Sequence, residues 1–295
     1  MLHKNKSFLR TFVRIFALVL VLSMMLVGCE EESPKKDFPA VNQNPSGNNN
    51  NSNNNSNNSN NNSNNNSSNN NSNNNNNSAN SNSSGKKRVA ITYDDGPHNV
   101  TTVNIVDELS KYGFHATFFV VGNRIDGTAY SGAKGLKYAA SKGNEIAIHG
   151  YTHKQDEDHY YDTCSPETFR SELGDTKSAI LSQVPNANIK LMRPIGGRIT
   201  SERITNCGYA VIMWSVDSND WRYKSAGAEG VETIVDNVMS QVQNGSIILM
   251  HDIYENTYLA TKEILKQLNA QGYEVVTVSE LLGNPQSGVK YSKAS

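Results

Sequence analysis

The stretch Ile91-Thr92-Tyr93-Asp94-Asp95-Gly96-Pro97 places two adjacent carboxylates directly after an apolar run. The apolar residues from Val89 to Tyr93 predict a buried strand, and Gly96-Pro97 is typical of the turn that ends one. Neighbouring side chains of an extended chain point to opposite faces, so Asp94 and Asp95 can share a site only if the strand ends here. Asp-Gly-Pro is also ordinary turn chemistry. Other parts of the chain must therefore decide what the two carboxylates do.

Residues 86–285 alternate apolar runs with helical patterns. Continuous apolar strands separated by helices indicate an α/β fold with a mainly parallel sheet. With about seven such units, a (β/α) barrel is favoured over an open sheet. Ser165 is a candidate N-cap, because Pro166 follows at the first helical position. Strands are predicted at 89–93, 116–121, 145–149, 189–192, 209–214, 246–250 and 274–278, and helices at 102–111, 133–142, 166–181, 201–206, 230–243 and 258–271.

Polar clusters follow the predicted strands at the point where each strand ends. In β/α barrels the chemistry lies at the carboxyl ends of the strands, so these side chains should meet at one end of the barrel. The clusters are Asp94-Asp95, His149 to His153, Arg193, Asp217 to Asp220, and His251-Asp252.

Two histidines, His149 and His153, stand four residues apart after one of these strands. By itself the pair favours solvent-exposed loop histidines. Together with Asp95 it gives three protein ligands and leaves open positions for water, as in catalytic zinc sites. Imidazole and carboxylate suit zinc and other first-row divalent metals. Gly150 follows His149, so the sequence lacks the His-Glu-x-x-His pattern of zinc proteases.

Arg193 and His251 each end another predicted strand. An arginine aimed into a cleft needs a carboxylate partner, and Asp94 is available; a surface arginine is an equally good interpretation of Arg193 alone. The glycine at 196 lets a backbone N–H approach a bound oxygen closely. A lone histidine is usually structural, but His251 beside a metal site is a credible proton donor. Trp221 follows Asp220 and offers a flat ring on which a sugar can stack, although tryptophan is more often core.

Taken in order, these stretches resemble the polysaccharide deacetylase family, the NodB-homology domain of carbohydrate esterase family 4. The resemblance covers roughly residues 86–285. It implies a distorted (β/α) barrel with about seven parallel strands. It also implies a hydrolase that removes acetyl groups from N- or O-acetylated sugars with one divalent metal ion, for which we expect zinc, with cobalt, nickel or iron as alternatives.

The resemblance also implies a role for each matching residue. It makes Asp94 the general base, paired with Arg193, and His251 the general acid, tuned by Asp220. The remaining assignments are metal ligation by Asp95, His149 and His153, an oxyanion-binding backbone N–H at Gly196, and apolar walls around the acetyl methyl at Trp221 and Leu249. Three positions depart from the family: Gly150 replaces a Ser or Thr that steadies the ligand loop, Ile195 replaces a common Pro, and Gly196 stands where Tyr is common.

The chain begins with a basic segment followed by an apolar run from Ile15 to Val27. That run is short for a bilayer span, which takes about 20 residues, so it favours a signal segment. The run ends at Gly28-Cys29, which resembles a bacterial lipoprotein signal: we expect residues 1–28 to be removed and Cys29 to be lipidated. An uncleaved apolar anchor is the alternative. Both interpretations place the rest of the chain outside the cytoplasm, attached to the membrane.

Residues 29–85 are expected to be a disordered tether, because residues 42–84 are almost wholly Asn and Ser and offer little to bury. As a flexible coil its mean span is on the order of 40 Å. The domain is expected at 86–285 and a tail at 286–295. The two further cysteines, Cys164 and Cys207, lack the CxxC spacing of a metal or redox site, and we expect both to be unpaired.

Charge argues against nucleic acid as a partner. Without residues 1–28 the chain keeps 23 basic residues against 28 acidic ones, whereas a nucleic-acid binder shows a basic surface. We expect a monomer that acts on an acetylated polysaccharide, either N-acetylglucosamine of peptidoglycan or a chitin-like glycan. Two alternatives stay open: an O-acetyl esterase acting on xylan, and a lipoprotein that binds glycan without catalysis.

Overall fold

The computed structural model describes residues 85–127 and 131–295. The predicted signal segment, Cys29 and the Asn/Ser-rich tether up to residue 84 lie outside the described residues. Within the described part of the chain, no helix combines the length and the apolar character needed to cross a bilayer. Cys164 and Cys207 are both free thiols.

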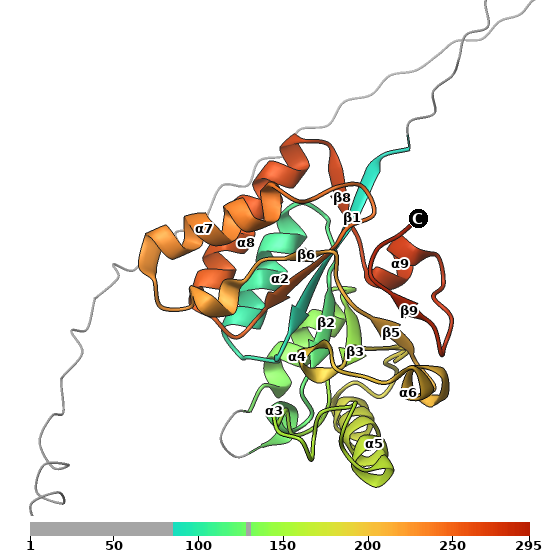
Figure 1. The fold of residues 1–295 in the computed structure, drawn as a ribbon. Helices are drawn as coiled ribbons and strands as arrows, with labels where there is room; N and C mark the ends of the chain where they lie inside the picture. The colour runs from blue at the N-terminus through green and yellow to red at the C-terminus, as the bar shows by residue number, and fades with distance from the viewer. Residues whose placement is uncertain (1–84, 128–130) are drawn as a thin grey trace, which may run out of the picture. The chain divides into compact units, whose positions relative to one another are not determined.

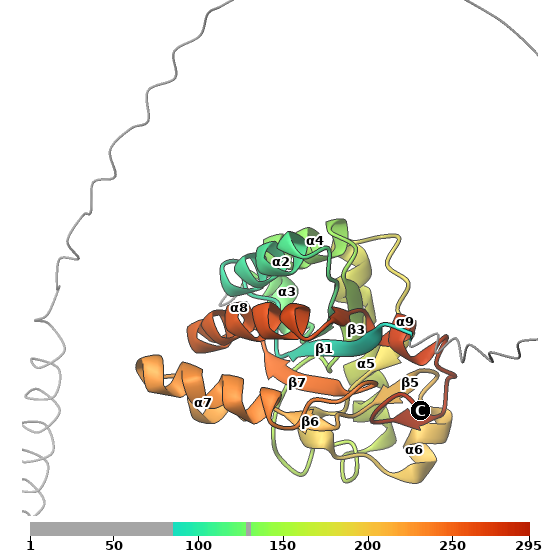
Figure 2. The same ribbon diagram turned by 90° about the horizontal axis from the view of Figure 1, so that it is seen from above.

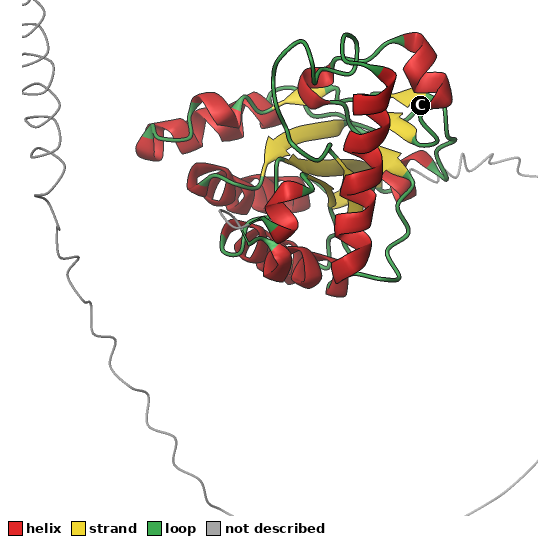
Figure 3. Ribbon diagram, turned by 90° about the horizontal axis from the view of Figure 1, so that it is seen from below, coloured by secondary structure: helices red, strands yellow, loops and turns green. Residues whose placement is uncertain are grey.

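A curved parallel sheet forms the middle of the domain, and helices pack around it (Figure 1; Figure 3). Its order across residues 85–127 and 131–295 is β6-β7-β1-β2-β3-β4-β5-β9, and β8 pairs with the start of β1. The expected distorted barrel of parallel strands is confirmed. The strands are β1 (Lys87–Asp94), β2 (Thr117–Val120), β3 (Glu145–Ile148), β4 (Leu191–Met192), β5 (Ala210–Ile212), β6 (Val216–Asp217), β7 (Ile247–His251), β8 (Tyr273–Val275) and β9 (Lys290–Tyr291).

Alternation along β1 sorts its side chains between two cores. Val89, Ile91 and Tyr93 belong to the larger core, which the helices cover. Ala90 belongs to a smaller core that includes Phe119 and residues of four further strands, inside the curve of the sheet. The same alternation directs Asp94, at the end of β1, toward this inner side.

The helices cover the outer side of the sheet, and α2, α4 and α8 lie side by side over β1 and β3 (Figure 2). Ser165 caps α5 by accepting the backbone N–H of Thr168, as predicted, with Pro166 in the first turn. The helices are α2 (Thr101–Lys111), α3 (Asn123–Asp126), α4 (Ala133–Ser141), α5 (Pro166–Gln183), α6 (Ser201–Asn206), α7 (Gly227–Met239), α8 (Glu255–Ala270) and α9 (Val278–Leu282), with short 3-10 turns at Ile195–Gly197 and Asp220–Arg222.

The largest differences from the sequence expectations lie near the C-terminus. The predicted strand 274–278 ends at Val275, because Thr277 and Glu280 form a capping box that starts α9. Residues 286–295, expected as a tail outside the domain, contribute β9, which pairs with β5. The short strands β6 and β9 were not predicted, because each pairs one apolar or aromatic residue with a charged one and does not belong to an apolar run, unlike the equally short β4.

Candidate active site

The turn after β1 brings both carboxylates to one place. Asp94 is the last residue of the strand, and Asp95 takes the left-handed conformation with φ 71°, so the chain leaves the strand between them. Such a conformation is uncommon for a residue other than glycine and is concentrated at functional sites. At Gly96 a Cβ would lie 2.2 Å from Asp252 Oδ1, so only glycine fits there.

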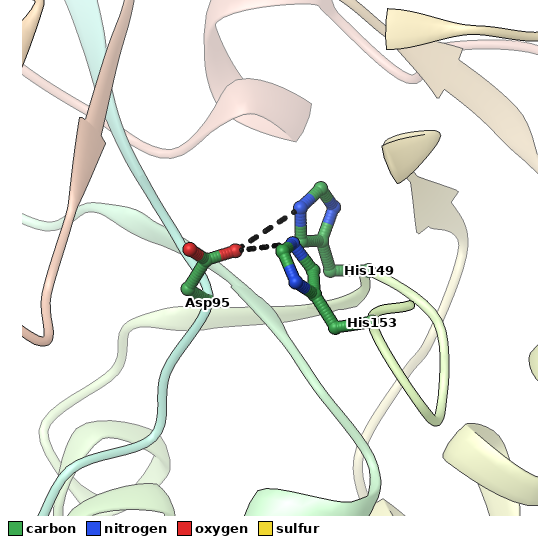
Figure 4. A group of neighbouring side chains, drawn as sticks. All are labelled: Asp95, His149 and His153. Carbon is green, nitrogen blue, oxygen red and sulfur yellow. Dashed lines mark ion pairs between the residues drawn. The ribbon is translucent and has the colours of Figure 1, made fainter. Parts of the chain in front are cut away.

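Asp95, His149 and His153 form a compact ligand cluster (Figure 4). One ligand atom from each residue lies within 4.8 Å of the others. Asp95 Oδ1 is 2.8 Å from His153 Nε2 and 3.4 Å from His149 Nε2. The turn after β1 supplies the carboxylate, and the loop after β3 supplies both imidazoles. The three ligands predicted from the sequence therefore converge.

The orientation of these groups fits a divalent cation. His149 Nδ1 donates to the Arg193 carbonyl at 2.9 Å, which leaves Nε2 facing Asp95; metal-ligating histidines are oriented by such a bond at the other ring nitrogen. Asp95 Oδ1 is buried and has no hydrogen-bond partner of acceptable geometry among the described residues. A buried carboxylate oxygen without a donor is costly unless something else binds it. One carboxylate and two imidazoles are a donor set that zinc and its first-row neighbours accept.

Burial by itself raises the pKa of Asp95, but the two histidines outweigh it, and its pKa lies well below the usual range. The pKa of His149 moves the opposite way. Burial lowers it, whereas Asp94, Asp95 and the Arg193 carbonyl together raise it above its usual value. A cation entering the cluster therefore competes with a proton for His149.

Asp94 is held by a guanidinium that has no exposed surface. Arg193 Nη1 donates to Asp94 Oδ1 at 2.7 Å and to Thr92 Oγ1 at 2.8 Å. Its Nε and Nη2 donate to the backbone carbonyls of Ile212 and Met213, both at 3.0 Å. Every nitrogen of this buried charge thus has an acceptor, as a buried ion pair requires. Asp94 Oδ2 lies 3.6 Å from His149 Nε2, toward the ligand cluster.

His251 is fixed from behind by Asp220, which is completely buried. His251 Nδ1 donates to Asp220 Oδ1 at 2.7 Å, and its backbone N–H donates to Oδ2, also at 2.7 Å. The Thr257 hydroxyl donates to Oδ2 at 2.7 Å as well. Burial lowers the pKa of His251, but the Asp220 carboxylate outweighs it and raises the pKa to about 9.

These groups surround one cavity of about 380 Å³ at the carboxyl ends of the strands. Arg193 and Asp220 do not line it; they stand behind Asp94 and His251. Trp221 is 46% exposed at the rim, and Gly196, at φ 60°, brings its backbone to the wall. Of the residues predicted for the site, the lining includes Asp94, Asp95, His149, His153, Gly196, Trp221, Leu249 and His251.

The sequence did not single out several residues of the site. Trp214, Tyr254 and Gln155 also line the cavity. Thr92 and Thr257 support Arg193 and Asp220 from a strand interior and from α8. The local sequence around these residues does not indicate their contacts, because the partners lie far away along the chain.

Asp252 is a buried carboxyl beside the site. It is completely inaccessible to solvent, and the Thr102 hydroxyl donates to Oδ2. Oδ1 has no hydrogen-bond partner among the described residues. Burial raises the pKa of Asp252 to about 7, and the bond from Thr102 only partly opposes the rise.

Comparison with known proteins agrees with this geometry. A model of the family described as polysaccharide deacetylase matches residues 81–212. A peptidoglycan-N-acetylglucosamine deacetylase of Bacillus cereus is 34% identical over 207 residues, which cover 68% of this chain and 90% of that protein. The chain belongs to the polysaccharide deacetylase family. The resemblance noted from the sequence is thereby confirmed.

Two further members are similar in sequence and structure. The peptidoglycan-N-acetylmuramic acid deacetylase PdaC of Bacillus subtilis is 37% identical over 196 residues, and the match spans 66% of this chain but only 39% of PdaC. The solved PdaC structure has a TM-score of 0.59 at 36% identity, covering 67% of this chain and 90% of that one. A family 4 acetyl xylan esterase from Clostridium thermocellum, in complex with a cobalt ion, has a TM-score of 0.61 at 30% identity, covering 70% and 98%.

Proposed function

We propose that this chain is a metal-dependent hydrolase that removes N-acetyl groups from a cell-wall or exported polysaccharide, either N-acetylglucosamine of peptidoglycan or a chitin-like glycan. The observation that carries the proposal is the meeting of Asp95, His149 and His153 beside Asp94 and His251 in one cavity. The names of the Bacillus cereus and Bacillus subtilis relatives support the substrate class.

Asp95, His149 and His153 would hold one divalent cation, and the proposed ion is zinc, with cobalt, nickel or iron as alternatives. A cation bound there supplies Lewis acidity, which makes water a stronger nucleophile near neutral pH and polarises a carbonyl. The fit rests on Asp95 Oδ1, which is buried without a well-oriented hydrogen bond from the described residues, and on the Nε2 atoms of both histidines, which lie within ion-pair distance of it.

The protein's own residues move the protons. Asp94 accepts a proton from the attacking water on Oδ2, because Oδ1 is bound to Arg193. His251 donates its Nε2 proton to the leaving amine, because Nδ1 is bound to Asp220. The Gly196 backbone N–H stabilises the oxyanion. Trp221 and Leu249 form apolar walls around the acetyl methyl group.

Asp94→Asn tests this assignment. The amide keeps the size of the carboxylate but cannot accept the proton, so acetate release from N-acetylglucosamine oligomers should fall at least about 100-fold. Metal content should stay at the wild-type level, because Asp95 and both histidines remain. Asp175→Asn, on the exposed surface of α5, is the matched control and should keep full activity. Wild-type activity in Asp94→Asn would overturn the mechanism.

O-Acetyl esterase activity is the second candidate, favoured by the similarity to the cobalt-bound acetyl xylan esterase. A panel of metal-loaded assays with N-acetylglucosamine oligomers, peptidoglycan and acetylated xylan separates the two. Acetate release from xylan alone would favour the esterase. Binding to these glycans with no release from any of them would favour the third possibility, a glycan-binding lipoprotein.

We place the domain outside the cytoplasm, held to the membrane through a lipid on Cys29. The support is the apolar run that ends at this cysteine and the Asn/Ser-rich stretch between it and the domain. In a bacterial host, Cys29→Ala should prevent incorporation of labelled fatty acid and release the protein from the membrane fraction. Unchanged membrane retention together with an unchanged N-terminus would contradict lipidation.

A further inference from the structure

The residues between the two histidine ligands, Gly150 to Thr152, decide whether His149 and His153 can reach one cation. Figure 4 shows both imidazoles on this one loop. We propose that Glu172, on α5, is the positioning residue of the loop and thereby sets the affinity of the cluster for its metal. This inference rests on the metal site of the proposed function and deepens it.

Glu172 accepts three hydrogen bonds from this loop. Its Oε2 accepts the backbone N–H of Tyr151 at 2.5 Å and that of Thr152 at 3.0 Å. Its Oε1 accepts the Thr152 hydroxyl at 2.6 Å. The residue is 4% exposed, so little water is available to take over these bonds. Bonds from N–H and O–H groups to a carboxylate are about twice as strong as neutral ones.

Backbone N–H groups at and just before the start of α3 hold the acceptors of the same loop. The backbone N–H of Gly122 donates to the Gly150 carbonyl at 2.9 Å, and that of Asn123 donates to the Tyr151 carbonyl at 3.0 Å. The loop is thus bonded both to the start of α3 and to the carboxylate on α5. A shift of the loop away from either element breaks the bonds to it.

Steric contact removes the remaining freedom. Gly150 has φ 102°, and a Cβ built there would lie 2.4 Å from the Tyr161 hydroxyl and 3.0 Å from Glu172 Oε2. Tyr161 and Glu172 therefore occupy the volume that a side chain at 150 would need. The loop has no side-chain hydroxyl at position 150. Contacts from α5 and from the segment that precedes α5 hold the loop instead.

The carboxylate group is what the loop requires. Glu172 offers two acceptor oxygens to three donors, whereas Gln offers one oxygen and one NH₂ group. Glu172→Gln keeps all three contacts only if the Thr152 hydroxyl turns to accept from the NH₂ group, and every bond to the loop then lacks the negative charge that strengthens it. Mutation of a residue that orients metal ligands weakens metal binding or activity about 10–100-fold.

The test measures metal affinity rather than catalysis. Zinc and cobalt dissociation constants of the metal-free protein are determined by competition with a chromophoric chelator for wild type, Glu172→Gln and Thr152→Val. Glu167→Gln, an exposed glutamate on the same helix that forms an ion pair with Arg170, is the matched control. We expect the metal dissociation constant to rise about 10–100-fold in Glu172→Gln, to rise less in Thr152→Val, and to stay unchanged in Glu167→Gln.

The unfolding midpoint of each metal-free variant separates positioning from stability. A Glu172→Gln protein with wild-type metal affinity and a lowered midpoint would show a purely structural role and overturn the inference. If Glu172→Gln does not fold, Thr152→Val decides, and an unchanged dissociation constant there overturns it. Wild type that binds metal but releases no acetate overturns the proposed function alone; wild type that binds no metal overturns both.

Discussion

Asp94 and His251 occupy paired positions at the ends of the adjacent parallel strands β1 and β7. Side chains at paired positions of a parallel ladder point to the same face, so both open into the same cavity. The proposed base and the proposed acid thus come from one pair of strands, although 157 positions separate them in the sequence. The ligand cluster lies beside Asp94, and its imidazoles come from the loop after β3.

Metal binding should stabilise the fold, because the ligands come from two separate segments of the chain. At a free zinc concentration one hundred times the dissociation constant, the free energy of unfolding should rise by about 2.7 kcal/mol. Chemical denaturation with and without zinc measures this. In Asp95→Ala the increment should disappear along with acetate release. A zinc-dependent increment that persists in Asp95→Ala would locate the metal elsewhere.

Arg193→Lys should be costly although it keeps the charge. Lysine cannot reach Asp94, Ile212 and Met213 together, so at least one buried carbonyl loses its donor. We expect the free energy of unfolding to fall by about 1–3 kcal/mol. The measurement is urea denaturation of the metal-free protein. Arg198→Lys is the control: Arg198 pairs with Glu157 and Asp162 near the surface, where such a change costs at most about 1 kcal/mol.

Asp220→Asn should move the alkaline limb of the pH–rate profile. With Asp220 ionised, the pKa of His251 is raised from 6.5 to about 9, so the acid keeps its proton at neutral pH. The amide removes that charge, and the limb should move toward lower pH by roughly one to two units. A bound cation lowers the pKa in both proteins, so the two are compared at equal metal load. Identical alkaline limbs would exclude His251 as the acid tuned by Asp220.

The same shift predicts a pH dependence of stability in the metal-free protein. The folded-state pKa of His251 exceeds its unfolded value, so its stabilising contribution is complete below pH 6.5 and is lost as pH rises through about 9. Asp220→Asn should flatten that decline.

The stability of Asp252→Asn relative to wild type should increase as pH rises. Burial raises the pKa of this carboxyl from 3.8 to about 7, so between these values the folded state holds a proton that the unfolded state has lost. Relative to the variant, the free energy of unfolding of wild type should therefore fall by up to about 1.4 kcal/mol per pH unit from about pH 4 to about pH 7. Denaturation of both metal-free proteins across this range checks the sign. A constant difference would show that Asp252 is ionised throughout.

Local pattern was enough to predict the scaffold. The apolar run of β1 and the Gly96-Pro97 turn have their cause in adjacent residues, and the N-cap at Ser165 was correct for the same reason. Thr277 and Glu280 also have the spacing of a capping box, but the apolar residues before Val278 favoured a continuing strand in the prediction. β9 could not be predicted, because its place in the sheet depends on β5, far earlier in the chain.

The residues of the site also fall into those that local sequence indicates and those that it does not. Asp94, Asp95, His149 and His153, which line the cavity, could be singled out because they follow strand ends, where a barrel gathers its chemistry. The residues that hold them were not, because Thr92, Thr257 and Glu172 act across elements distant in sequence. A strand-end rule identifies the groups that face the cavity, but it gives no information about the groups behind them.

The position of β9 has a consequence for solubility. The backbone N–H of Val211 in β5 and that of Met213, just after β5, donate to the carbonyls of Val289 and Tyr291. A protein cut after residue 285 would leave these donors unpaired on a bare strand edge, and such edges recruit strands from other molecules. Truncation at that point should therefore favour aggregation, although it leaves every residue of the cavity in place.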